Sequence, residues 1–130
     1  MESDSQKKRS AGILFHPSSF PTSPVCGTFG SAARDWLNYL SDNGIGIWQF
    51  LPLSPTDRSG SPYNSPSGFA FNPWFLDVED LVEEGFLDDN EINKLPLSPK
   101  DKLNRVDFGL AEIRSGIVGN SLKDMWPKQS

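Results

Sequence analysis

The sequence predicts an α/β fold that starts with a parallel strand–helix–strand unit. The continuous apolar run at residues 12–15 is typical of a strand that is buried on both faces of a parallel sheet, and residues 45–51 predict a second strand. Between them, apolar residues recur at helical spacing. This stretch is long enough for a βαβ unit, which needs roughly thirty residues or more. The 11 Gly and 11 Pro in 130 residues predict many loops and argue against a long-helix bundle.

The first strand is expected to end at His16-Pro17, because proline cannot donate a hydrogen bond to a neighbouring strand. Residues 17–27 form a proline- and serine-rich loop, and a helix follows. Ser31 is its predicted N-cap and Gly44 its predicted stop. One face of this helix collects the apolar side chains Phe29 (just outside the helix), Ala33, Trp36, Leu37 and Leu40.

The second strand ends at Pro52 and leads into a long polar loop, residues 54–72. Loops longer than about 12–15 residues are usually functional or disordered. This loop carries Tyr63, Phe69 and Phe71, which favour an ordered, ligand-facing loop over a flexible linker. Because two parallel strands cannot cover their own faces, the unit needs further strands beside it.

Two more helices are predicted in the second half. A short acidic helix runs from its N-cap Asp77 to Glu84, with Gly85 as the stop, and residues 95–99 are extended. The last helix runs from about Leu110 to Lys123. The side chains expected to face inward are Val78, Leu81 and Val82 on the first helix and Leu110, Ile113, Ile117 and Val118 on the second.

The charge and the first residues exclude several classes of partner. A net charge of −5 argues against binding to nucleic acid or to an anionic membrane, because both need a basic surface. The run Lys7-Lys8-Arg9 is interpreted as part of a solvated tail. Residues 1–10 are expected to be a disordered leader and match neither a signal peptide nor a transit peptide. No apolar run is long enough to span a bilayer.

The single cysteine and single histidine limit the chemistry. Cys26 cannot form an internal disulfide, which fits a reducing compartment and predicts a cytoplasmic protein. It has no basic neighbour in the sequence and is interpreted as an ordinary thiol. No His/Cys cluster has metal-ligand spacing, and no cofactor is predicted.

The residues that suggest a ligand follow the second strand. A sugar needs flat apolar surfaces for its ring and polar groups for its hydroxyls. The loop and the strand before it supply this mixture, and ligands of α/β folds bind beyond the carboxyl ends of the strands. The alternative for each residue is ordinary turn closure or loop packing. The candidate contacts are Gln49, Ser61, Tyr63, Ser65 and Asn72.

His16 ends the first strand and is a sixth candidate. It either touches the ligand or is a structural histidine that holds the following proline-rich loop, and both interpretations remain open at this stage. From the residues alone, the prediction is a polar ligand loop on an α/β scaffold.

Five ordered blocks extend this prediction, because they resemble the start of the 4-α-glucanotransferase (amylomaltase, disproportionating enzyme) family. Their spacing also fits, and RVDFG at 105–109 resembles a later family segment that usually has Tyr in place of Phe108. The blocks are RSAGILFHPSSFP at 9–21, WQFLPLSPT at 48–56, SPYNS at 61–65, NP at 72–73 and LVEEG at 81–85.

The resemblance implies that residues 11–130 are the amino-terminal part of a (β/α)₈ barrel that transfers α-1,4-glucan segments with retention. Such chemistry uses a carboxylate nucleophile and an acid/base about 5 Å apart. In the family these carboxylates lie on later strands, beyond residue 130, and none of the 17 acidic residues here matches them. The Ser-Pro-Tyr loop of the family lines the donor sugar site, which implies that role for Ser61 and Tyr63 and, less directly, for Asn72.

Two departures from the family pattern fall in this loop. Arg58-Ser59-Gly60 stands where the family often has an aromatic residue and Gly-Asp, and Phe71 replaces a usual glycine. The alternative to an active enzyme is a non-catalytic glucan-binding or decayed fragment.

Overall fold

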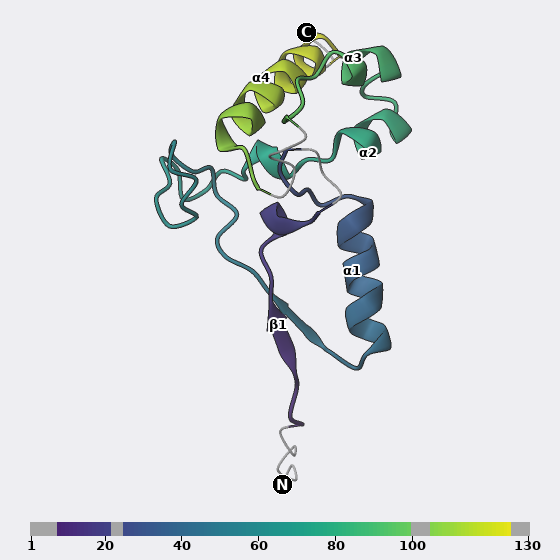
Figure 1. The fold of residues 1–130 in the computed structure, drawn as a ribbon, viewed down its shortest axis with the longest axis vertical. Coiled ribbons are helices and arrows are strands. Elements are labelled where there is room, and N and C mark those ends of the chain that lie inside the picture. Colours follow the sequence, from purple (N-terminus) through teal and green to yellow (C-terminus); the bar gives the residue numbers. More distant parts are fainter. Residues whose placement is uncertain (1–7, 22–24, 100–104, 126–130) are drawn as a thin grey trace, which may run out of the picture.

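The computed structural model describes residues 8–21, 25–99 and 105–125, and it confirms the strand–helix–strand unit. Strand β1 (Gly12–Leu14) pairs in parallel with β2 (Ile47–Gln49), and helix α1 (Ser31–Asp42) connects them. The register places Gly12 opposite Ile47 and Leu14 opposite Gln49. Figure 1 shows α1 running beside the two strands, with the remaining helices gathered beyond the carboxyl ends of the strands. Most of the predicted leader, residues 1–10, lies outside the described residues.

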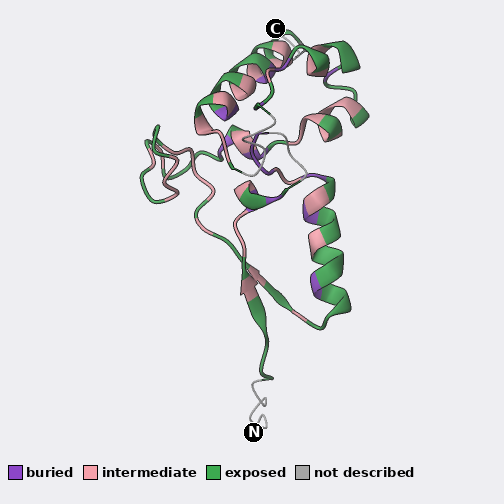
Figure 2. Ribbon diagram, in the orientation of Figure 1, coloured by how far each residue is buried: buried purple, intermediate pink, exposed green. Residues whose placement is uncertain are grey.

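The sequence predicted that both faces of the two strands are buried, and this prediction is wrong for the described residues. Ile13 and Trp48 are half-buried, whereas Leu14 is 58% and Ile47 is 50% exposed. Figure 2 shows this alternation along the strands. Since side chains alternate across a strand, α1 covers one face only, and the opposite face has no cover among the described residues. The strand sequences are therefore apolar on both faces of the pair, but α1 covers only one of these faces.

Helix α1 begins at a glycine cap and not at the predicted Ser31 cap. Gly30 is the N-cap, and no side chain bonds to this end of the helix. A Cβ atom at Gly30 would overlap the carboxylate of Asp77. That carboxylate accepts a 2.5 Å hydrogen bond from Thr28 Oγ1 and a 3.0 Å bond from the Asp80 backbone N–H. The carboxylate of Asp77 therefore lies directly against the start of α1, and only glycine leaves room for it.

The predicted helix stops are confirmed. Gly44 has φ +68° and Gly85 has φ +80°, conformations in which glycine is favoured. Asp77 caps helix α2 (Val78–Glu83), as predicted, although the helix ends one residue earlier than expected. An exposed ion pair between Arg34 and Asp80, with both nitrogens 2.8 Å from a carboxylate oxygen, joins α2 to α1.

Several short elements, one of them in the first half of the chain, were not predicted from the sequence. Two short 3₁₀ helices, η1 (Pro17–Ser19) and η2 (Pro73–Phe75), each begin with proline. Helix α3 (Asp89–Asn93) starts with a capping box in which Asp88 and Glu91 bond to each other's backbone N–H. Residues 95–99 form no helix or strand.

Helix α4 (Phe108–Met125) packs through only part of the predicted face. Val118 is buried and Leu110 packs on the core, as predicted, whereas Ile113 is 56% and Ile117 is 38% exposed. The packed face also includes the buried Ala111 and Arg114, whose Nη1 donates a 2.7 Å hydrogen bond to the Pro96 carbonyl. The apolar pattern missed these two positions because an alanine and an arginine occupy them.

The core consists of two clusters beyond the strands. The first is formed by Val25, Cys26, Phe75 and Ala111, and the second by Leu87, Leu95 and Val118. Cys26 is buried, and burial raises the pKa of its thiol to about 12, so the thiol is protonated at neutral pH. Among the described residues, no helix combines the length and hydropathy that crossing a bilayer requires.

We expect Gly30→Ala to lower the free energy of unfolding by about 1–3 kcal/mol, because the new Cβ displaces Asp77 and weakens the cap of α2. Gly46→Ala is the matched control, since a Cβ there meets nothing within 4 Å, and a change within about 0.5 kcal/mol is expected. Thermal unfolding of both variants checks this. Equal midpoints for the two variants would contradict the close packing of Asp77 on α1.

Candidate functional site

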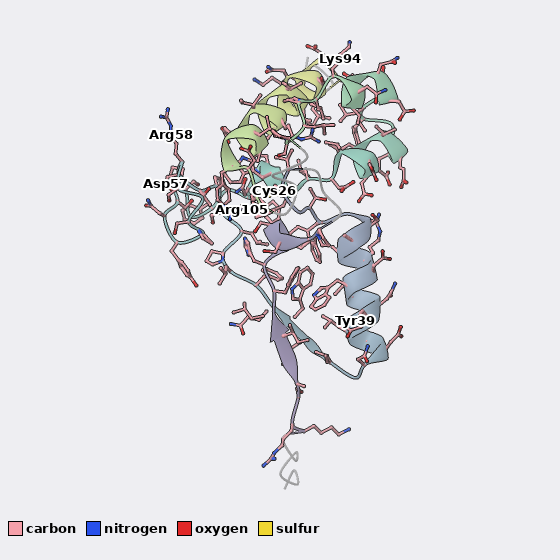
Figure 3. All side chains as sticks on the ribbon, in the orientation of Figure 1. Cys26, Tyr39, Asp57, Arg58, Lys94 and Arg105 are labelled. Atoms are coloured by element: carbon pink, nitrogen blue, oxygen red, sulfur yellow. The ribbon has the colours of Figure 1, made fainter. Side chains whose placement is uncertain are left out.

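The candidate site is the segment that follows the carboxyl end of β2. It begins at Phe50, and the loop returns to the body of the protein where the Asn72 backbone N–H donates a 2.8 Å hydrogen bond to the Leu53 carbonyl. Figure 3 shows this loop, marked by Asp57 and Arg58, extending away from the helices, with Arg58 projecting outward.

Asp57 organises the loop, and the sequence analysis did not select it. Its carboxylate accepts hydrogen bonds from the Ser59 N–H (2.9 Å), the Ser59 hydroxyl (2.5 Å) and the Asn64 amide. Its own N–H donates to the Asn64 carbonyl at 3.1 Å. The bonds from Ser59 are the main cause that lowers the pKa of Asp57 from its usual value. A carboxylate that accepts a hydrogen bond from the N–H two residues later forms an Asx turn, and an aspartate two residues before a serine is a sequence signal of this turn.

Ser61 and Tyr63 lie at the outer part of this loop. The Tyr63 backbone N–H points to the Ser61 hydroxyl oxygen at 3.4 Å, so these two candidates are adjacent in space. The Tyr63 side chain is 75% exposed. This exposure argues against the alternative that Tyr63 packs the loop against the protein, and it leaves the phenol free for a ligand.

Ser65 makes its hydrogen bonds inside the loop. Its hydroxyl donates to the Ser67 carbonyl at 2.7 Å and accepts from the Ser67 N–H at 3.1 Å. This is the geometry of the turn-closing alternative. A ligand contact of Ser65 would use its remaining lone pair.

Asn72 forms the base of the loop and is only 1% exposed. Its Oδ1 accepts a 3.0 Å hydrogen bond from the Trp74 N–H and caps η2. Its Nδ2 is buried without a hydrogen-bond partner among the described residues. Asn72 thus fixes the point at which the loop rejoins the core.

Gln49 and His16 lie at the carboxyl ends of the two paired strands. The Gln49 side chain is exposed, while its carbonyl accepts a 2.9 Å bond from the Phe15 N–H. The His16 ring meets the Phe75 ring edge-on at 5.4 Å, and its Nδ1 is buried without a hydrogen-bond partner among the described residues. Burial lowers the pKa of His16, so the imidazole is neutral at neutral pH.

A shallow hollow of about 540 Å³ opens directly after β2. Phe50, Phe69 and Phe71 contribute aromatic surface to it, and Phe69 is fully exposed. Neither Ser61 nor Tyr63 lines this hollow, although both belong to the same loop. The hollow thus supplies the flat apolar surface that a sugar ring requires, with Ser54 as its one hydroxyl side chain. Within the described ranges, no group of three His, Cys, Asp or Glu side chains could hold a metal ion.

A second cavity, of about 350 Å³, lies between α4, η2 and the start of α1. None of the six candidate residues lines it. None of the six lines the hollow either, but the hollow is formed by the segment after β2 and by the end of the same loop, so the candidate site comprises the loop and the hollow.

Comparison with known proteins identifies the family. The family model described as 4-alpha-glucanotransferase matches residues 15–121, which include α1, β2 and the whole loop. The chain belongs to the 4-α-glucanotransferase family. The resemblance found in the sequence blocks is thereby confirmed.

Curated relatives from distant organisms support the same family assignment. The 4-alpha-glucanotransferase of Thermus thermophilus is 40% identical over 102 residues, which are 78% of this chain and 19% of that protein. The chloroplastic/amyloplastic 4-alpha-glucanotransferase of Solanum tuberosum is 34% identical over 124 residues, or 92% of this chain and 21% of that protein. The chain thus spans about a fifth of the length of the curated relatives that it matches.

The fold agrees with a solved member of the family. The structure of amylomaltase from Streptococcus agalactiae in complex with acarbose superposes with a TM-score of 0.82 at 31% identity. The match covers 94% of this chain and 24% of that one.

We expect Asp57→Asn to speed tryptic cleavage after Arg58, because the substitution removes a charged acceptor from three hydrogen bonds that hold the loop. Asp42→Asn, at the exposed end of α1, is the matched control and should be cleaved like the wild type. The time course of loop cleavage, followed by mass spectrometry at neutral pH, checks this. An unchanged rate in Asp57→Asn would show that the carboxylate does not order the loop.

Proposed function

We propose that this chain is the amino-terminal part of a catalytic (β/α)₈ barrel, residues 11–130, that transfers α-1,4-glucan segments to new acceptors with retention. The main support is the placement of the family's Ser-Pro-Tyr loop beyond the carboxyl end of a parallel strand, where barrels bind their ligands. The uncovered face of β1 and β2 supports the barrel, since neighbouring strands and side-chain layers would cover it.

The proposed reaction needs two carboxylates, a nucleophile and an acid/base, about 5–5.5 Å apart. The nucleophile breaks the glycosidic bond and forms a glycosyl-enzyme while the acid protonates the leaving sugar. The hydroxyl of an acceptor sugar then attacks the glycosyl-enzyme and releases the nucleophile. The acid/base residue takes the proton of that hydroxyl. We assign both carboxylates to the part of the catalytic domain that the relatives have in addition to the matched segment.

The residues of this chain contribute to substrate binding. We propose that Ser61 and Tyr63 contact the donor sugar, with Asn72 holding the base of their loop and Gln49, Ser65 and His16 bordering the same region. No cofactor takes part, and neither nucleic acid nor a membrane is a partner. Because Cys26 is a buried free thiol, the cytoplasm is the proposed location.

The first test is activity. A polypeptide that carries this segment with the rest of the catalytic domain should convert maltotriose into glucose and longer maltooligosaccharides, detected by chromatography. Residues 1–130 alone should give no transfer, because a missing nucleophile and acid remove most of the rate enhancement. Binding of maltooligosaccharide by the complete polypeptide without any transfer would instead support a non-catalytic glucan-binding protein.

The second test concerns the Tyr63 hydroxyl. Tyr63→Phe keeps the ring and removes one hydrogen bond, which is worth about 0.5–1.5 kcal/mol, or more to a charged group, so turnover should fall several-fold to about a hundredfold. If the hydrogen bond of the Tyr63 hydroxyl strengthens as the sugar distorts toward the transition state, turnover should fall by a larger factor than the affinity for the substrate. Steady-state kinetics and thermal midpoints of Tyr63→Phe and Tyr63→Ala check this. Unchanged turnover in Tyr63→Phe would remove the hydroxyl from the mechanism.

A further inference from the structure

The loop that presents Ser61 and Tyr63 holds itself together. Each hydrogen bond that the structure gives to residues 57–68 has its partner within residues 56–70. Among the described residues, hydrogen bonds therefore define the shape of the loop but do not connect its outer part to the helices. Another contact must set where the outer part lies.

Gly60 makes such a contact, immediately before Ser61. Its φ of +71° is in the left-handed region, which favours glycine. A Cβ atom there would lie 2.5 Å from Cε2 and Cζ of Phe108, so the Gly60 backbone packs directly against the outer edge of that ring. This contact joins the loop to the start of α4, far along the chain.

Phe108 is itself held firmly. It is the first residue of α4, and its ring lies 5.7 Å from the Trp74 ring at an interplanar angle of 30°. The Trp74 indole N–H donates a 2.8 Å hydrogen bond to Glu112 on the next turn of α4, and Trp74 packs on the core around Phe75. The Phe108 ring is therefore a fixed part of the protein body against which the loop rests.

We propose that the contact between Gly60 and Phe108 positions Ser61 and Tyr63 for the sugar, and that Phe108 is a positioning residue for substrate binding. The proposal rests on the proposed glucan transfer. Phe108 acts through the loop and does not itself touch the sugar.

The inference predicts that removing the ring affects the site more than the fold. Phe108→Ala, in the polypeptide with the complete catalytic domain, should lower kcat/KM for maltotriose by about tenfold or more, mainly through KM, because small displacements of a binding group are costly. Tryptic cleavage after Arg58 should become faster. Leu110→Ala is the matched control: it lies on the same turn of α4 and packs on the Val25 and Phe75 cluster, so kcat/KM should stay within about twofold of wild type.

Three further variants test the contact, two of them from the loop side. Gly60→Ala should also lower kcat/KM, because its Cβ pushes against the Phe108 ring, and adding Phe108→Ala should cost less in this background than in wild type. Phe108→Leu keeps apolar volume and should lie between wild type and Phe108→Ala.

The outcomes separate the two hypotheses. A complete wild-type polypeptide without transfer activity would overturn the proposed function, and proteolysis after Arg58 in Phe108→Ala would still decide whether Phe108 anchors the loop. An active wild type in which Phe108→Ala matches Leu110→Ala in KM and in cleavage rate would overturn the positioning role and leave glucan transfer intact.

Discussion

The parallel pairing of β1 with β2 is the constraint on which the rest of the structure depends. Parallel strands cannot be joined by a tight turn, so the chain must cross back along the sheet, and α1 makes that crossing. The crossing brings the carboxyl ends of both strands to one edge, where His16 follows β1 and the loop follows β2. The position of the candidate site is thus a direct result of strand direction.

Aromatic packing connects this edge to the rest of the molecule. Phe15 lies 5.1 Å from Trp36 on α1, and the Trp48 indole N–H donates to the Phe15 carbonyl at 2.7 Å. Phe29 then lies 5.9 Å from Trp48 and 6.1 Å from Phe75, which carries the packing on to η2. Large rings cover much surface for few residues, so they give a short segment a firm base beneath its long loop.

The parts of the fold that the sequence predicted are those with local causes. Gly44, Asp77 and Gly85 were identified correctly, because a helix stop or cap depends on a few neighbouring residues. The capping box of α3 was equally local, and its Asp-x-x-Glu spacing at residues 88–91 could have been used. The cap of α1 could not be predicted, because a carboxylate almost fifty residues away lies against Gly30.

In the candidate site, too, the features with local causes were predicted and those that depend on tertiary packing were not. The sequence identified the loop and its motif, but not which of its residues are buried: Asn72 closes the base, while Tyr63 extends into solvent. The sequence also did not predict the contact between Phe108 and the loop, because that contact depends on how α4 packs.

A loop that is fixed at its base and bonded to itself at its outer part can keep one shape while it presents exposed groups to solvent. The base is set by the Leu53–Asn72 hydrogen bond, and the outer part is shaped by Asp57. Pro62 restricts the backbone of Ser61 and fixes one angle of its own, so little conformational freedom remains in this part of the loop. Exposure of the Tyr63 side chain and order of its backbone are therefore compatible.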